Sequence, residues 1–163
     1  MYQFFVDPGA ISEKQVVITG KDVNHIKNVL RMKVGEEIAV SNGVDGREYR
    51  CGILQMTEDA VICELRFIKE DGVELPSKIY LFQGLPKADK MELIIQKAVE
   101  LGAAEVIPVA MKNCVVKLDA KKAAAKTARW QEIAKSAAKQ SKRSRIPVVR
   151  EPVNYREAVA LAG

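Results

Sequence analysis

The chain of 163 residues carries 26 Lys and Arg side chains against 21 Asp and Glu, which gives a net charge of +5. This length suits one domain or two small ones, and the hydrophobic share of 48% is typical of a globular protein. No stretch approaches the roughly 18 apolar residues needed to span a bilayer, and the start lacks the pattern of an export signal. We therefore expect a cytoplasmic protein that makes no membrane contact.

The three cysteines form neither a disulfide pattern nor a metal-site pattern. Cys51, Cys63 and Cys114 are an odd number of thiols, and no two of them are spaced as CxxC. The single histidine, His25, has no cysteine or acidic cluster beside it that would suggest metal ligation. The sequence thus predicts no metal site and reduced thiols that serve the structure.

The charge is distributed unevenly along the chain. Residues 1–75 hold 9 Lys and Arg against 13 Asp and Glu, whereas residues 76–163 hold 17 against 8. Between Lys112 and Arg145 there are 11 basic residues and only Asp119 and Glu132 as acids. Such a segment indicates either a surface that faces phosphates or a solvated helix face, and the charges alone weigh the two about evenly.

The first part of the chain reads as short strands separated by turn signals. Alternating apolar residues predict strands over 2–6, 15–19, 37–41, 48–55 and 60–68, with one helix over 22–30. Turn dipeptides such as Asn42-Gly43 and Asp45-Gly46 separate the strands. Short strands closed by such turns suggest a small barrel, and the polar connector 69–76 sets the boundary of a domain over 1–73.

The second part alternates strands with helices. A strand over 79–82, expected to be buried on both faces, a helix over 89–101 and a strand over 105–109 predict a βαβ unit with a parallel sheet. Asp89 and Glu92 resemble a capping box, and Gly102 suits a left-handed helix end. The apolar helix face is expected to hold Met91, Ile94, Ile95, Ala98 and Leu101.

A long helix over 120–140, a strand over 146–149 and a short helix from 154 are expected to complete a domain over 76–163. A sheet with so few strands leaves an edge and an apolar face uncovered, so we expect something further to pack against it. Trp130 lies within the apolar stripe of the long helix, which favours a core position over a platform for base stacking.

Several basic residues are placed to contact a ligand. Lys142, Arg143 and Arg145 follow the long helix at a helix–loop junction, where basic side chains can clamp a nucleic-acid backbone. Lys87 and Lys90 follow the first strand of the second domain, at the end of the sheet where open α/β folds bind ligands. His25 lies beside an apolar helix face, and a structural role is favoured there over a catalytic one.

Three segments, in order, carry a family resemblance. The stretch QGLPKADKMELIIQKAVELGAAEVIPV closely resembles the RsmE-type ribosomal RNA methyltransferases of the SPOUT class. Residues 25–31 with Val34-Gly35 are similar to the N-terminal signature of that family. Residues 114–119, Arg129-Trp130 and residues 138–143 are similar to its central region.

The resemblance implies an α+β protein, in which a PUA-like β-barrel that docks RNA precedes part of a SPOUT-type α/β domain with a parallel sheet. It implies methylation of N3 of a specific uridine in small-subunit ribosomal RNA, with S-adenosylmethionine as the methyl donor. The implied partners are ribosomal RNA or the small ribosomal subunit, together with a second copy in a homodimer. The residues expected to contact RNA are His25, Arg31, Lys87, Lys112, Lys117, Gln140, Lys142, Arg143 and Arg145.

The GPEGG-like loop and the LGxRILRxETA-like segment, which the resemblance assigns to the methyl-donor pocket, do not occur in this sequence. We therefore interpret the chain as the N-terminal two-thirds of such an enzyme, inactive alone and carrying no assignable catalytic residue. The main alternative is a non-catalytic RNA-binding protein without a donor site. A third possibility is a fragment with no role of its own, destabilised by its open sheet edge.

Overall fold

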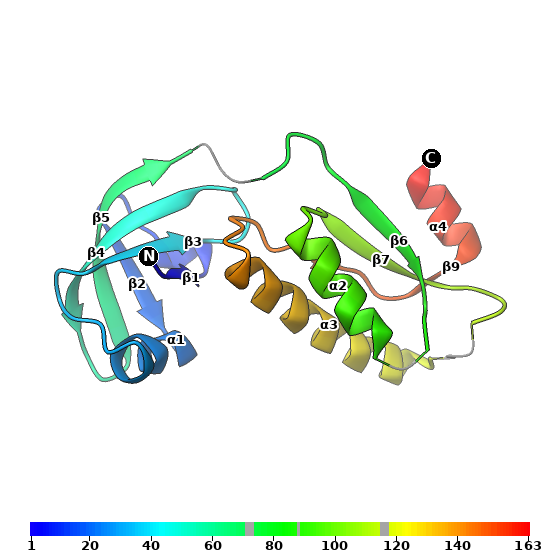
Figure 1. Cartoon of the computed structure of the whole chain (residues 1–163), viewed down its shortest axis with the longest axis horizontal. Helices are drawn as coiled ribbons and strands as arrows, with labels where there is room; N and C mark the ends of the chain where they lie inside the picture. Colours follow the sequence, from blue (N-terminus) through cyan, green and yellow to red (C-terminus); the bar gives the residue numbers. More distant parts are fainter. Residues whose placement is uncertain (71–73, 88, 115–117) are drawn as a thin grey trace. The chain divides into compact units, whose positions relative to one another are not determined.

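The computed structural model describes residues 1–70, 74–87, 89–114 and 118–163, which form two compact units (Figure 1). Unit 1 consists of Met1–Glu74 together with Lys142–Arg145. Unit 2 consists of Leu75–Ser141 and Ile146–Gly163. Four residues that follow the long helix in the sequence thus group with the N-terminal unit, and the chain leaves and re-enters unit 2 around them.

Unit 1 is built on a curled sheet with the strand order β1-β3-β4-β5-β2 (Figure 1). Its strands are β1 (Gln3–Phe5), β2 (Gln15–Thr19), β3 (Glu37–Ser41), β4 (Glu48–Met56) and β5 (Ala60–Lys69). All neighbours pair antiparallel except β1 and β3. The register between β4 and β5 shifts twice, and such bulges bend a strand and increase its twist, which lets the sheet curl round its core.

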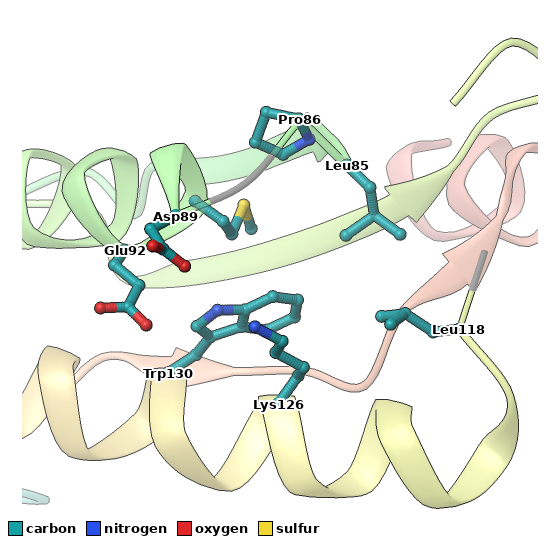
Figure 2. Close-up of a pocket in the computed structure, with 8 residues that line it drawn as sticks. Leu85, Pro86, Asp89, Glu92, Leu118, Lys126 and Trp130 are labelled. Carbon is teal, nitrogen blue, oxygen red and sulfur yellow. The ribbon is translucent and has the colours of Figure 1, made fainter. Parts of the chain in front are cut away.

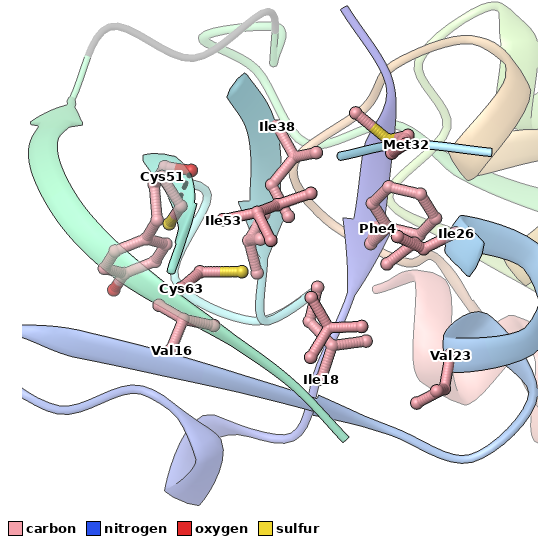
Figure 3. Close-up of a cluster of buried hydrophobic side chains, with 13 residues drawn as sticks. Phe4, Val16, Ile18, Val23, Ile26, Met32, Ile38, Cys51, Ile53 and Cys63 are labelled. Carbon is pink, nitrogen blue, oxygen red and sulfur yellow. Dashed lines mark hydrogen bonds between the residues drawn. The ribbon is translucent and has the colours of Figure 1, made fainter. Parts of the chain in front are cut away.

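A single apolar cluster fills the inside of this sheet (Figure 3). Its members alternate along the strands, since every second side chain of a strand points to the same face. Cys51 and Cys63 belong to the cluster as small apolar side chains. The buried members are Phe4, Val16, Ile18, Val23, Ile26, Met32, Ile38, Val40, Tyr49, Cys51, Ile53, Val61 and Cys63.

The helix predicted over 22–30 has two parts. Its first part is α1 (Lys21–Asn24), which follows β2; a separate short 3₁₀ turn, η1 (Pro8–Ala10), lies before β2. The helix then widens into a π-helical turn, η2 (His25–Val29), whose Leu30 N–H donates to the His25 carbonyl over 2.8 Å. This widening keeps Val23 and Ile26 in the core. Periodicity alone does not reveal it, because a single wide turn hardly changes which residues are apolar.

Unit 2 contains the predicted βαβ arrangement. The elements are β6 (Tyr80–Gly84), α2 (Lys90–Glu100), β7 (Glu105–Ala110), α3 (Ala120–Gln140), β8 (Val148–Val149), β9 (Val153–Asn154) and α4 (Tyr155–Ala162). Strand β7 is central and pairs in parallel with β6, β8 and β9. The strand predicted over 146–149 begins only at Val148, because Pro147 cannot donate to a sheet ladder.

The helix ends differ in part from the predictions. Asp89 makes no side-chain capping bond, so the predicted capping box at α2 is wrong. Asp119 instead caps α3 by accepting from the Lys122 N–H over 2.8 Å, and Asn154 with Glu157 forms a capping box on α4. Gly102 does take the predicted left-handed conformation, at φ +98°. An added Cβ there would lie 2.6 Å from a Leu75 methyl group.

The buried face of α2 follows Met91, Ile95 and Val99, and Trp130 of α3 is buried as predicted. Leu101 is 78% exposed, so its predicted place in the core is wrong. It lies one residue beyond the end of α2, where the chain turns away from the helical stripe.

Strand β6 is not buried on both faces as expected. Ile79 is 48% exposed and Tyr80 is 50% exposed, and the remaining residues of β6 are only partly covered. In the described sheet β6 has a partner on one side only, which is β7. The edge that we expected from the small number of strands is therefore β6. None of the helices in the described ranges is both long and apolar enough to cross a membrane.

Burial of two thiols makes unit 1 less stable as the pH rises through the alkaline range. Burial raises the pKa of Cys51 to about 12 and that of Cys63 to about 11. The thiols of the unfolded chain ionise from about pH 8.5, so the stabilisation is complete below that pH and is lost above it. We expect the free energy of unfolding to fall above pH 9 by about 1.4 kcal/mol per pH unit for each thiol.

Urea denaturation at several pH values measures this dependence, with the Cys51→Ala/Cys63→Ala variant as the control. Since all other titrating groups are shared, the variant should lose only the thiol contribution to the pH slope. Equal slopes in the two proteins would show that the thiols are not responsible.

Candidate nucleic-acid interface

The predicted RNA contacts fall on both units. His25, Arg31, Lys142, Arg143 and Arg145 belong to unit 1. Lys87, Lys112 and Gln140 belong to unit 2, and Lys117 lies outside the described residues. The structure thus brings the basic segment after α3 together with the N-terminal sheet, although the two are far apart in the sequence.

His25 packs against the core of unit 1. Its ring meets the ring of Phe4 edge-on, with centroids 6.2 Å apart and an angle of 85° between the planes. Phe4 is fully buried, whereas His25 is half-buried at the start of η2. This position fits the structural reading of His25, and one face of the residue still reaches solvent.

Arg31 and Lys142 share a strained backbone. They are the non-glycine residues with positive φ among those described, at φ 52° and φ 57°. Each follows the end of a helix, where glycine is the usual left-handed residue. A residue with a Cβ atom in this conformation lowers the free energy of unfolding by about 1–2 kcal/mol. Both positions nevertheless carry an exposed basic side chain. Strain of this kind is concentrated at functional sites.

Arg143 differs from the other predicted contacts because its side chain is buried. It is 6% exposed and forms an ion pair with Glu74, to which its Nε also donates at 3.2–3.3 Å. The guanidinium predicted to bind RNA is therefore engaged within unit 1. Sequence reasoning missed Glu74, because the two residues are 69 positions apart and no local pattern links them.

Arg145 lies against the turn between β3 and β4 while remaining exposed. It forms a β-bridge with Gly43, and its guanidinium approaches the Asp45 carbonyl at 3.5 Å. Gly46 leaves room for this side chain, since a Cβ there would stand 2.8 Å from Arg145 Nε. Arg47 of the same turn is exposed as well, so two guanidiniums occupy this surface.

In unit 2, Lys87 and Lys112 lie at the same end of the sheet. Lys87 follows β6 and Lys112 follows β7, and these two strands run parallel in register. Both side chains are exposed. Gln140 is the last residue of α3 and is also exposed. The predicted ligand end of the sheet thus carries two lysines.

A pocket of about 140 Å³ lies at this end of unit 2, where the start of α2 faces α3 (Figure 2). A hydrogen bond from Arg129 holds the pKa of Glu92 below its ordinary value, so Glu92 stays negative. Asp89 adds a second carboxylate, and Lys126 is the one cation among the lining residues. This chemistry disfavours phosphate. The described lining is Leu85, Pro86, Asp89, Met91, Glu92, Leu118, Lys126 and Trp130.

Comparison with known proteins decides the family. The RNA methyltransferase domain family matches residues 73–162, more than half of the chain, and the RNA methyltransferase PUA domain family matches residues 18–66. This chain belongs to the RNA methyltransferase family. The predicted fold class, a PUA-type domain followed by a methyltransferase domain with a parallel sheet, is confirmed.

Two relatives of this chain carry the same protein name. Ribosomal RNA small subunit methyltransferase E of Bacillus subtilis is 44% identical over 86% of this chain and 54% of its own length. The same protein from Neisseria gonorrhoeae, solved bound to S-adenosyl methionine, is 34% identical with a TM-score of 0.83. That match covers 98% of this chain and 65% of the solved one.

A methyltransferase of Legionella pneumophila, solved with bound cofactor SAM, is 31% identical with a TM-score of 0.80. It is matched over 97% of this chain and 65% of its own. The predicted recognition as an RsmE-type methyltransferase is thus confirmed at the level of the family. The chain spans about half the length of the Bacillus relative.

The strain at Arg31 and Lys142 makes a prediction about stability. Replacing either residue by Gly should raise the free energy of unfolding by about 0.5–1 kcal/mol, because relief of the left-handed strain exceeds the entropy that glycine adds to the unfolded chain. Urea denaturation measures the change. Arg31→Ala and Lys142→Ala keep the Cβ atom and should show no gain, so equal effects of Gly and Ala would contradict the assignment of strain.

Proposed function

We propose that the whole protein transfers a methyl group from S-adenosylmethionine to N3 of one uridine in small-subunit ribosomal RNA, and that this chain carries the RNA-docking part. The proposal rests on the family and on the names of the relatives, two of which were solved with the donor bound. The observation that carries the docking role is a group of exposed basic residues on unit 1, which includes Arg31, Arg47, Lys142 and Arg145.

The docking role follows from charge and exposure. Phosphate contacts by Lys and Arg supply most of the affinity for nucleic acid and fix its position, while they carry no sequence information themselves. Unit 1 holds an excess of acids in its N-terminal 75 residues, so its basic side chains stand out locally rather than as part of a general positive field. Lys142 and Arg145 add two positive charges to this unit from the C-terminal half of the chain.

The pocket at the sheet end does not fit the methyl donor. Ligand pockets usually measure about 300–1,000 Å³, whereas the pocket at the sheet end measures about 140 Å³ and presents two carboxylates. We therefore assign no residue of this chain to S-adenosylmethionine and none to removal of the N3 proton. What this chain contributes to the reaction is binding and orientation of RNA, which is where positioned reactants gain much of their rate.

The same observation favours a second candidate function, an RNA-binding protein without methyl transfer. Both candidates predict that the protein binds RNA, but only the first predicts that it binds S-adenosylmethionine. Isothermal titration of the full-length protein with S-adenosylmethionine separates the two, because tight binding would contradict the second candidate. Homodimerisation of the whole protein is part of the first proposal, and sedimentation of the full-length protein tests it.

The docking proposal predicts salt-dependent RNA affinity with defined contacts. Lys142→Ala and Arg145→Ala should each weaken binding to a small-subunit ribosomal RNA transcript. Each should also lower the slope of log affinity against log salt by about 0.7–0.9, because each removes one phosphate contact. Filter binding over a range of KCl concentrations measures both quantities. Lys14→Ala, which removes an exposed lysine of the same unit, is the matched control.

Salt-independent or absent RNA binding by the unmodified chain would overturn the proposed function. Loss of affinity in Lys14→Ala equal to that in the two test variants would show general charge attraction rather than a docking site.

A further inference from the structure

The segment Lys142–Arg145 alternates between exposed and buried side chains. Lys142 and Arg145 are exposed, whereas Arg143 is 6% exposed and Ser144 is 2% exposed. Four residues with three positive charges would suggest three equivalent RNA contacts. The structure instead separates the two outer residues, which reach solvent, from the inner pair, which is packed into unit 1.

The Glu74 carboxylate binds both a side chain and the backbone of the segment Lys142–Arg145. The Glu74 carboxylate accepts from the N–H groups of Ser144 at 3.1 Å and Arg145 at 3.0 Å, and it pairs with the guanidinium of Arg143. The side chain of Arg143 is only 7% exposed and that of Glu74 only 16%. Charge-assisted bonds of this number in a water-poor site fix geometry strongly.

A second anchor comes from the sheet of unit 1. Gln3 on β1 donates to the Arg143 carbonyl at 2.9 Å and to the Ser41 hydroxyl at 3.2 Å. Ser41 in turn donates to the Arg47 carbonyl at 3.0 Å. The backbone from the Arg143 carbonyl to the Arg145 N–H is thus fixed by Gln3 of β1, which also bonds Ser41 of β3, and by Glu74 of the connector.

We infer that Glu74 and Arg143 are positioning residues, which hold Lys142 and Arg145 in place to contact the phosphate backbone of RNA, and that Arg143 itself makes no RNA contact. This deepens the proposed function and rests on it. The anchored backbone begins directly after the left-handed Lys142, whose φ of 57° is a strained conformation that the surrounding structure has to maintain. The anchor also explains why Arg145 bridges to Gly43 and lies over Gly46.

The test is a double-mutant cycle on Glu74 and Arg143, with RNA affinity and its salt slope as the readouts. Glu74→Gln removes a negative charge, so simple electrostatics predicts tighter RNA binding. Our inference predicts about tenfold or more weaker binding and a slope lowered by about 1.4–1.8, the equivalent of two phosphate contacts. Glu13→Gln removes the same charge at an exposed site in unit 1 away from the proposed contacts, and it should leave affinity within about twofold or raise it.

Arg143→Met leaves Glu74 without its cation and should also weaken binding. The double variant Glu74→Gln/Arg143→Met has no unpaired buried charge, and its glutamine still accepts from the two backbone N–H groups. The inference predicts that this double variant regains most of the lost affinity. If Arg143 touched RNA, the double variant would bind as weakly as Arg143→Met alone, and Glu74→Gln would not weaken binding.

Folding of each variant is checked by circular dichroism, and binding is measured at a temperature where all are folded. Ser144→Ala is the control within the segment, because its hydroxyl is buried and has no hydrogen-bond partner among the described residues. It should leave the affinity unchanged. An unmodified chain that fails to bind RNA would overturn the proposed function. Weakening by Lys142→Ala and Arg145→Ala without weakening by Glu74→Gln would overturn the positioning role alone.

Discussion

The partly buried carboxylate of Glu74 is the constraint around which unit 1 is completed. Removing a carboxylate and a guanidinium from water is costly, and the cost is offset only when good geometry and further hydrogen bonds satisfy both groups. Here the guanidinium of Arg143 and two backbone N–H groups meet that condition. A segment from the second half of the chain is thereby bound into the N-terminal unit. Loss of either partner would leave an uncompensated charge in a site with little access to water.

The two units present surfaces of different chemistry. Unit 1 presents isolated cations on an ordered framework, two of them on left-handed backbone where glycine would be more stable. Unit 2 presents Lys87 and Lys112 at the ligand end of a parallel sheet, beside a pocket whose two carboxylates repel phosphate. The exposed cations of unit 1 and the pocket at the sheet end of unit 2 therefore offer different chemistry to a ligand.

Regular elements could be predicted closely from the sequence because they depend on local periodicity. The strands over 15–19 and 37–41 and the helix over 120–140 have the predicted bounds. Predictions failed at three points: Asp89 does not cap α2, Leu101 lies beyond the end of α2 and is exposed, and β6 is not buried on both faces. For the site, exposure of Lys142 and Arg145 followed from their charge. Burial of Arg143 did not, because its counter-ion lies 69 residues away.

The distance between Glu74 and Arg143 along the chain has a consequence for synthesis on the ribosome. Translation proceeds at about 5–20 residues per second, so Arg143 is added roughly 3–14 seconds after Glu74. During that interval the curled sheet has all five of its strands but lacks the segment that Gln3 and Glu74 bind. Unit 1 therefore cannot reach its final form before most of unit 2 has been made. The two units mature together, although the first is almost entirely encoded before the second.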